Sequence, residues 1–147
     1  MQKRNAVIFD MDGTLCNVSS IEHFVSGEEK DFHAFHMGSA SCPPNLHVVE
    51  AARQVHARGD AVLIVTARMR RYERVTSMWL ALHEVPSTGL YMRPDGDYRK
   101  DAFVKRDILR RIRSRYNPVH AWDDRPEVVE VWESEGIPCT VVPRWGG

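Results

Sequence analysis

The feature that most constrains the fold is the alternation of short apolar runs with amphipathic stretches along the 147 residues. Apolar runs typical of buried strands occupy residues 6–9, 61–65, 90–92, 119–122 and 139–142. Helical patterns occupy the stretches between them, at residues 45–58, 70–83, 100–116 and 126–135. This alternation predicts an α/β fold, a doubly wound, Rossmann-like parallel sheet of about five strands with flanking helices.

The composition is that of an ordinary globular domain. Hydrophobic residues make up 43% and charged residues 27% of the chain, and 20 basic residues balance 20 acidic ones. These values exclude a disordered tail and a fibrous repeat, and they predict one domain over residues 1–147. Proteins that wrap long nucleic acids usually carry a basic excess, so we expect any nucleic-acid contact to be local.

Cysteine usage and hydropathy predict a soluble, cytoplasmic protein with no membrane association. Cys16, Cys42 and Cys139 are scattered and form no CxxC pair, which is typical of reduced thiols in a reducing compartment. The apolar runs are far too short to span a bilayer, and charges interrupt the first ten residues before a signal-peptide core forms.

Residues 15–44 interrupt the alternation. They hold few periodic apolar residues, several His, Ser and Gly, and the pair Pro43-Pro44. A connection this long without regular structure is usually functional or partly disordered, so we expect a lid-like insertion after the first strand. The chain also lacks a GxxxxGK[ST] phosphate loop, which argues against an ATP-dependent kinase half within it.

The strongest chemical signal is Asp10-Met11-Asp12-Gly13-Thr14, directly after the first apolar run. Ligands of open α/β sheets bind beyond the carboxyl ends of the strands, so both carboxylates are expected to project into that crevice. Asp10 would attack as a nucleophile, and Asp12 would protonate the leaving oxygen and then deprotonate water. A surface turn is the alternative, but DxDGT arises by chance in only roughly one chain per thousand of this length.

Two further positions suit phosphate chemistry. Thr66 ends an apolar run, where its hydroxyl can hold a phosphoryl oxygen or simply cap the strand, and Arg68 can add a bidentate clamp. Lys105 lies early in a predicted helix and can neutralise charge on the phosphorus and on Asp10. Lys100 competes for that role, and spacing alone does not separate the two lysines.

The adjacent acids Asp123 and Asp124 end the fourth apolar run. Neighbouring carboxylates are costly there unless a cation lies between them and Asp10, and an oxygen-rich site suits Mg²⁺. We therefore expect Asp10, Asp12, Asp123 and Asp124 to hold Mg²⁺, which would offset repulsion as Asp10 attacks. The sequence leaves open which of Asp123 and Asp124 binds the metal directly, and Asp124 also suits a helix N-cap.

The ordered set of motifs resembles the haloacid dehalogenase (HAD) superfamily of phosphatases. The run VIFDMDGTL at residues 7–15 is similar to its motif one, and Thr66, Lys105 and the Asp123-Asp124 pair follow in the order of the other three motifs. More narrowly, the chain resembles the phosphatase domains of bacteriophage polynucleotide kinase/phosphatases. The segments that carry this second resemblance are HARG at 56–59, RKD at 99–101 and DDRPEVVEVW at 123–132.

The resemblance implies an enzyme that uses Mg²⁺ to remove 3′-phosphates from nucleic-acid ends. The sequence leaves open whether RNA or DNA is preferred and whether a separate kinase or ligase acts as partner. It implies a role for five residues: Asp10 as nucleophile, Asp12 as general acid/base, Thr66 and Arg68 as phosphate ligands, and Lys105 as the motif-three lysine. It also points to Asp101 as a carboxylate that orients Lys105 or Arg68. The chain departs from the family in residues 16–44, which contain no arginine, and in having Thr66 where serine is usual.

Two other functions compete with this interpretation. A phosphatase of the same superfamily that acts on mononucleotides or small metabolites would share the chemistry. A signalling receiver domain also uses an Asp phosphoacceptor, a Thr, a Lys and Mg²⁺. In receivers, however, the acidic pair comes first and the accepting Asp follows a later strand, and here the order is reversed.

Other polar clusters are weaker signals. Four histidines and a cysteine invite a zinc site, but their spacing is poor and solvated histidines are the favoured interpretation: His23, His33, His36, His47 and Cys42. An arginine cluster beside Thr66 is as well suited to contact a nucleic-acid backbone as to face solvent: Arg68, Arg70, Arg71 and Arg74. Tyr98, in a polar loop, is a candidate for base stacking.

Overall fold

The computed structural model describes residues 2–143 and is built on one parallel sheet of five strands in the order β3-β2-β1-β4-β5. The strands are β1 Arg4–Phe9, β2 Ala61–Met69, β3 Gly89–Arg93, β4 Tyr116–Asp123 and β5 Cys139–Val141. Every neighbouring pair is parallel. The predicted α/β class and doubly wound architecture are therefore confirmed.

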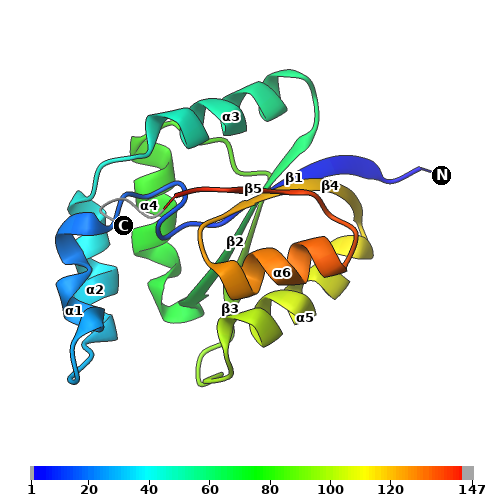
Figure 1. The fold of residues 1–147 in the computed structure, drawn as a ribbon. Helices are drawn as coiled ribbons and strands as arrows, with labels where there is room; N and C mark the ends of the chain where they lie inside the picture. Colours follow the sequence, from blue (N-terminus) through cyan, green and yellow to red (C-terminus); the bar gives the residue numbers. More distant parts are fainter. Residues whose placement is uncertain (1, 144–147) are drawn as a thin grey trace.

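Four helices cover the two faces of the sheet (Figure 1). Helices α3 (Leu46–Ala57) and α4 (Glu73–Leu82) pack on one face, and α5 (Asp101–Arg113) and α6 (Pro126–Ser134) pack on the other. Each helix follows one strand and precedes the next, so its apolar stripe meets the inward side chains of the sheet. Trp79 of α4 and Trp132 of α6 are almost completely buried, one in each of the two resulting cores.

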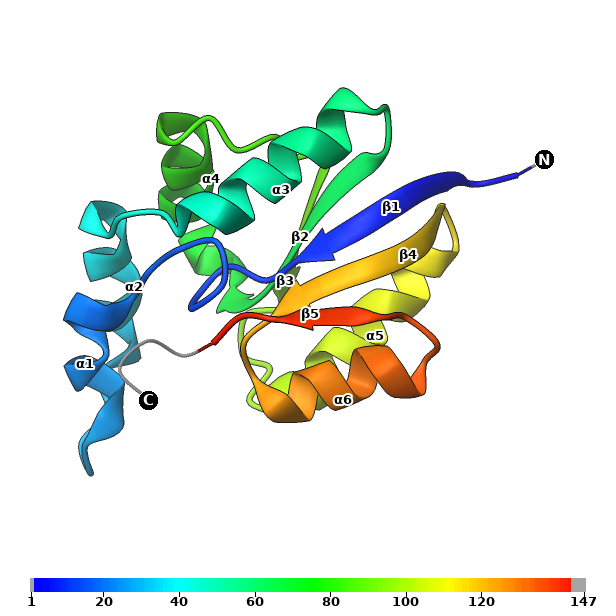
Figure 2. The ribbon, with the colours of Figure 1, turned by 45° about the horizontal axis from the view of Figure 1, so that its top comes forward.

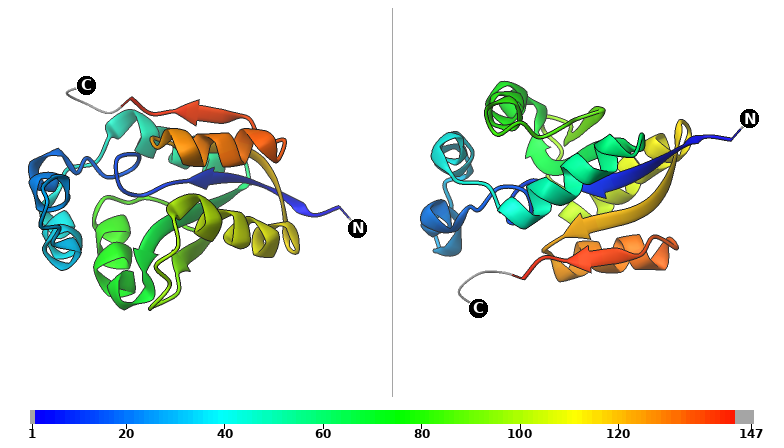
Figure 3. Two further views of the ribbon diagram at one scale, coloured as in Figure 1. Left: turned by 60° about the horizontal axis from the view of Figure 1, so that its bottom comes forward. Right: turned by 90° about the horizontal axis from the view of Figure 1, so that it is seen from above.

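Residues 15–44, which we call the lid, contain more regular structure than the sequence suggested. They form the short helices α1 (His23–Ser26) and α2 (Phe32–Gly38) and the 3-10 turns η1 (Ser19–Ile21) and η2 (Ser39–Ser41). Figures 2 and 3 show α1 and α2 together beyond the carboxyl ends of the strands. The indole of Trp79 donates a hydrogen bond to the Cys42 carbonyl at 2.9 Å, which ties the lid to α4.

Two predicted boundaries are wrong. The second strand does not end before Thr66 but continues to Met69, because Thr66 and Met69 pair with Met92 and Arg93 of β3 across an irregular register. The 3-10 turn η3 (Arg70–Tyr72) then leads into α4. The third predicted helical stretch, residues 100–116, ends at Arg113, and Tyr116 opens β4 because it pairs with Arg4 of β1.

The strand order reverses direction between β1 and β4. In parallel α/β sheets the crevice at such a switch point, outside the carboxyl ends of the strands, is the usual place for a ligand. The backbone N–H of Asp10 donates to the Trp122 carbonyl at 3.0 Å, which extends the β1–β4 pairing into the loops beyond. Among residues 2–143, no helix has the length and apolar character needed to cross a membrane.

Candidate active site

Asp10 is the first residue after β1, and its side chain lies in the crevice at the β1–β4 switch point. Asp10 is only 6% exposed. The Thr14 hydroxyl donates to Asp10 Oδ2 at 2.8 Å, which orients the carboxylate. The turn between them needs Gly13, because that residue has φ +82° and a Cβ there would collide with the Asp124 carboxylate. The DxDGT motif therefore forms a loop with little conformational freedom.

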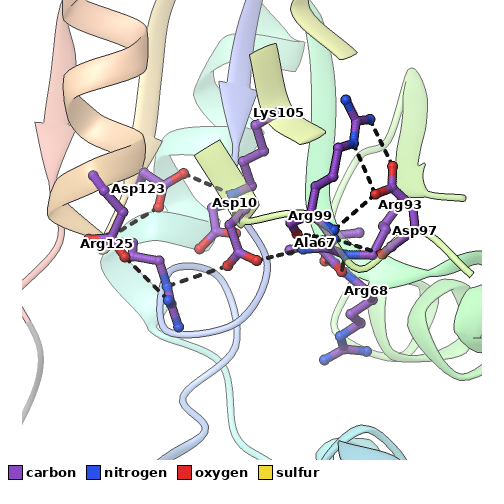
Figure 4. A network of polar contacts seen from close by, with 12 residues as sticks. Asp10, Ala67, Arg68, Arg93, Asp97, Arg99, Lys105, Asp123 and Arg125 are labelled. Carbon is purple, nitrogen blue, oxygen red and sulfur yellow. Dashed lines mark hydrogen bonds and ion pairs between the residues drawn. The ribbon is translucent and has the colours of Figure 1, made fainter. Parts of the chain in front are cut away.

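Lys105 is the cation that contacts Asp10, the predicted nucleophile. Its ammonium donates to Asp10 Oδ1 at 2.8 Å and to Asp123 Oδ2 at 2.9 Å (Figure 4). Lys105 is 2% exposed, on the inward face of α5, whereas Lys100 lies exposed at the start of that helix. Burial acts to lower the pKa of Lys105, but Asp10 and Asp123 outweigh it and raise that pKa. Lys105 therefore stays charged. Of the two lysines between which the sequence left the choice open, Lys105 rather than Lys100 contacts Asp10.

The acids around Asp10 form an oxygen-rich cluster. Asp10, Asp123 and Asp124 each offer a carboxylate oxygen, and these atoms all lie within 4.8 Å of one another. Burial and the charges of Asp123 and Asp124 raise the pKa of Asp10 well above its ordinary value, although Lys105 opposes the shift. The negative charge that these three carboxylates can carry therefore exceeds the positive charge of Lys105. A hard divalent cation such as Mg²⁺ fits this donor set and this charge.

Asp123 and Asp124 have different surroundings. Asp123 is 1% exposed, and its Oδ2 accepts from Lys105 and, at 3.3 Å, from the Trp132 indole. Its Oδ1 accepts from the backbone N–H groups of Asp124 and Arg125 at 2.9 and 3.2 Å. The Asp124 carboxylate instead lies against Gly13 and lines the cavity. Asp123 is thus held by protein donors on both oxygens, and Asp124 faces the space where a ligand would lie.

Asp12 is held apart from that cluster by Arg68. The Arg68 guanidinium donates to Asp12 from Nε at 3.0 Å and from Nη2 at 2.6 Å, and to the Thr76 hydroxyl from Nη1 at 2.9 Å. Burial acts to raise the pKa of Asp12, but the charge and hydrogen bonds of Arg68 outweigh it and lower that pKa. Among residues 2–143, the group of carboxylates that could hold a metal ion comprises Asp10, Asp123 and Asp124, and a role of Asp12 as a fourth metal ligand stays a prediction.

The two predicted phosphate ligands lie side by side on β2. The Thr66 hydroxyl accepts a hydrogen bond from the Arg68 backbone N–H at 3.1 Å, and both residues are 1% exposed. Arg68 lines the cavity, but its side chain is bound to Asp12 and Thr76, so its observed contact is with the predicted general acid/base. Binding of the phosphate by Thr66 and Arg68 stays a prediction.

The prediction for Asp101 is wrong. Its carboxylate contacts neither Lys105 nor Arg68 but binds Arg93 Nη2 at 2.6 Å and lies 3.5 Å from Arg125 Nε. The geometric reason is that Asp101 opens α5, one turn before Lys105, and faces the end of β3 rather than the β1–β4 crevice. Asp101 therefore links two arginines at the rim of the site.

Arg93 is the functional candidate that the sequence analysis missed. It is 7% exposed, and its guanidinium also donates to the carbonyls of Ala67, Asp97 and Arg99, as Figure 4 shows. These bonds hold the loop 94–100 against the end of β2. Its position in the sequence could have identified Arg93, because it directly follows the third apolar run and so lies at the edge of the sheet where the other site residues lie.

A single cavity of about 610 Å³ contains the catalytic candidates and extends beneath the lid. It is lined by Asp10, Asp12, Lys105, Asp123 and Asp124 at one end and by lid and rim residues further out. Arg71 and Tyr98, two of the residues predicted to contact nucleic acid, also line it, and Tyr98 is 83% exposed. Within residues 2–143, the histidines and Cys42 form no group that could hold a metal ion.

Comparison with known proteins assigns the chain to a phosphatase family. The family model described as the polynucleotide kinase PNKP phosphatase domain, of HAD type, matches residues 4–144. A curated protein of Autographa californica nuclear polyhedrosis virus, named as a bifunctional polynucleotide kinase/RNA ligase, is 29% identical over 136 residues. That match covers 90% of this chain and 18% of the viral protein, so the chain spans less than a fifth of that relative.

Solved structures agree with this assignment. A chain in the structure of a Pnkp1/Rnl/Hen1 complex has a TM-score of 0.84 and 27% identity, and the match covers 99% of this chain and 47% of that one. The class C acid phosphatase of Bacillus anthracis has a TM-score of 0.74 at 12% identity, covering 99% of this chain and 68% of that one, which shows a shared fold. A receiver domain is thereby excluded. The chain belongs to the family of HAD-type phosphatase domains of polynucleotide kinases.

Proposed function

We propose that this chain is a Mg²⁺-dependent phosphomonoesterase that removes 3′-phosphates from polynucleotide ends through an aspartyl-phosphate. The observation that carries the proposal is the geometry around Asp10: a buried carboxylate bonded to Lys105 and clustered with Asp123 and Asp124. Membership of a polynucleotide kinase phosphatase family supports a nucleic-acid end as the substrate. We retain Asp10, Asp12 and Lys105 as the catalytic residues.

The first chemical step is attack by an Asp10 oxygen on phosphorus. The new bond is O–P, and the bond between phosphorus and the 3′ oxygen breaks as Asp12 gives its proton to that oxygen. Lys105 neutralises part of the charge that gathers on Asp10 and the phosphoryl oxygens. Asp10, Asp123 and Asp124 would hold Mg²⁺, which would supply further neutralisation of the phosphoryl charge.

The second step is hydrolysis of the aspartyl-phosphate. Asp12 takes a proton from water, the water oxygen attacks phosphorus, and Asp10 leaves as a carboxylate while inorganic phosphate forms. Arg68 lowers the pKa of Asp12 and so favours the ionised form, which is the form that accepts a proton. We infer that Arg68 is a positioning residue that directs Asp12 at the cavity and favours its ionised form between the two chemical steps, after Asp12 has given its proton to the leaving group.

The direct test is phosphate release from matched RNA and DNA oligonucleotides that carry a 3′- or a 5′-phosphate, with a 3′-mononucleotide alongside, with and without Mg²⁺. The proposal expects strong Mg²⁺-dependent preference for the 3′-phosphorylated oligonucleotide. Equal or better turnover of the mononucleotide would instead assign the chain to nucleotide or metabolite hydrolysis. The names of the viral relative and of the solved complex support a separate kinase or ligase that acts on the same ends.

Replacing Asp12 by Ala is expected to separate the two chemical steps. With p-nitrophenyl phosphate the leaving group needs no proton, so attack by Asp10 proceeds, but water lacks its base. We expect a burst of one nitrophenolate per enzyme and then a steady rate at least about 10²-fold below the wild type. Stopped-flow absorbance measures the burst, and Asp60→Asn, at the opposite edge of the sheet, is the matched control. Absence of a burst together with steady turnover would contradict the assignment of Asp12.

Replacing Asp124 by Asn is expected to remove most of the stabilisation by Mg²⁺. A ligand present at a hundred times its Kd stabilises the folded state by about 2.7 kcal/mol, so Mg²⁺ should raise the Tm of the wild type by several degrees. Scanning calorimetry with and without Mg²⁺ checks this, with Glu130→Gln on the exposed face of α6 as control. An Asp124→Asn protein with the wild-type shift would argue against direct coordination by Asp124.

A further inference from the structure

The cavity is larger than a phosphate group requires, and its outer half has aromatic walls. Cavities of about 300 to 1,000 Å³ suit ligands of nucleotide or drug size, and this one measures about 610 Å³. The catalytic acids occupy one end only. Phe32, His33 and His36 of the lid and Tyr72 of η3 line the space beyond them, and we call these four residues the aromatic wall.

Three rings of the aromatic wall, those of His33, His36 and Tyr72, contact one another. The His36 and Tyr72 ring centroids lie 4.6 Å apart, and those of His33 and Tyr72 lie 5.8 Å apart. The Tyr72 hydroxyl and His33 Nδ1 are 3.1 Å apart, within hydrogen-bond distance. Tyr72 is 7% exposed, so the group has a fixed base in η3. The wall is therefore an ordered surface rather than a set of independent side chains.

Two observations indicate that the wall is built for a ligand rather than for the core. Phe32 lines the cavity and yet is 56% exposed, although a phenyl ring gains from burial. His36 Nδ1 is buried and has no hydrogen-bond partner among residues 2–143. Burial lowers the pKa of His36 to about 4, so this ring is neutral near pH 7 and can stack or accept a hydrogen bond.

Three arginines also line the cavity: Arg71, Arg99 and Arg125, each about half exposed. Their partners Asp95, Asp97 and Asp101 hold them at the rim. Guanidinium groups suit the phosphodiester backbone, and aromatic rings suit a base. Both sets of side chains line the same cavity as Asp10, where the terminal phosphate would react.

We propose that the aromatic wall binds the base of the 3′-terminal nucleotide while its 3′-phosphate lies at Asp10. The inference rests on the proposed function and adds a requirement: the terminal sugar must carry a base. Stacking is tolerant of base identity because every base offers a π face. The preferred substrate class is thus a base-bearing 3′-phosphate end, and an abasic 3′-phosphate end is a poor substrate.

The test compares two oligonucleotides of one sequence that end in a 3′-phosphate, one with a normal terminal nucleotide and one with an abasic terminal sugar. We expect kcat/KM of the wild type to fall about tenfold to hundredfold on the abasic end. Phe32→Ala and His36→Ala should lose activity on the normal end by a comparable factor and change little on the abasic end. Phe32 is exposed, so its truncation leaves the core intact even where His36→Ala unfolds. Phe103→Ala, on an exposed position of α5 outside the cavity, is the matched control.

Each outcome has a distinct meaning. Equal kcat/KM for both ends in the wild type would overturn the inference and leave the proposed function standing. Variants that lose activity on both ends by the same factor would overturn it as well, because the wall would then only support the lid. Release of phosphate from neither oligonucleotide would overturn the proposed function and this inference with it. Loss of the wild-type preference in Phe32→Ala, with the preference kept in Phe103→Ala, is the result that supports it.

Discussion

Replacing Asp10 by Asn is expected to abolish turnover while the fold is retained or stabilised. An amide oxygen is too weak a nucleophile to form the acyl-phosphate, so kcat on a 3′-phosphorylated oligonucleotide should fall by about 10³-fold or more. Residual activity above a few per cent would refute Asp10 as the nucleophile. Phosphate release under single-turnover conditions measures the loss.

The stability of the same variant provides an independent check. The pKa of Asp10 is raised by burial and by Asp123 and Asp124, so the protonated form is favoured by folding. Stability from that preference is present below the ordinary carboxyl pKa and is lost as pH rises through the raised value. Asn resembles the protonated form, so Asp10→Asn should have a higher Tm than the wild type at pH 7.5 in a metal chelator. The advantage should vanish at pH 3, where both side chains are neutral.

Replacing Lys105 by Met is expected to affect both stability and activity. It leaves Asp10 and Asp123 facing each other in a buried site without their shared cation. Breaking a buried ion pair by removing one partner costs roughly 3 to 5 kcal/mol, which is a large part of the stability of a domain of this size. Urea unfolding at pH 7.5 measures this loss, and kcat should fall by at least about 10²-fold.

The pH dependence identifies the cause of that loss. Without Lys105 the two carboxylates repel each other, and protonation relieves the repulsion, so the destabilisation should shrink as pH falls from 7.5 to 5. Lys100→Met removes a lysine of the same helix from an exposed position and should change the free energy of unfolding by less than about 0.5 kcal/mol. A pH-independent loss in Lys105→Met would point to packing rather than to charge.

The sheet and its loops were predictable because their signals are local and periodic. Each buried strand appears as an apolar run, and DxDGT and Asp123-Asp124 directly follow two of these runs. Since parallel strands end at one edge, the order of the motifs placed both acid groups at one site. The choice between Lys105 and Lys100 came from the structure, in which Lys105 shares one buried helical face with Ile108, Leu109 and Ile112, whereas Lys100 precedes the helix and is exposed.

The partners of arginine side chains could not be predicted in the same way. Arg68 bonds Thr76 and Asp12, which is 56 residues away, and Arg93 bonds backbone carbonyls in a loop without a motif. The partner of a long, flexible side chain is decided by which groups lie near it in the folded structure, and the periodicity of the sequence does not contain that information. The same reason applies to Asp101: the resemblance implied that it orients Lys105 or Arg68, whereas the end of β3 brings Arg93 to it.

The reversal of strand order between β1 and β4 also sets when the site can form. Phe9 pairs with Trp122, so the nucleophile and its acidic neighbours come together only across more than a hundred intervening residues. During synthesis at about 5 to 20 residues per second, the DxDGT loop leaves the ribosome roughly ten seconds before its partners. A nascent chain therefore exposes a complete DxDGT loop that has neither Lys105 nor the Asp123-Asp124 pair beside it. The enzyme becomes competent only in the last stage of its folding.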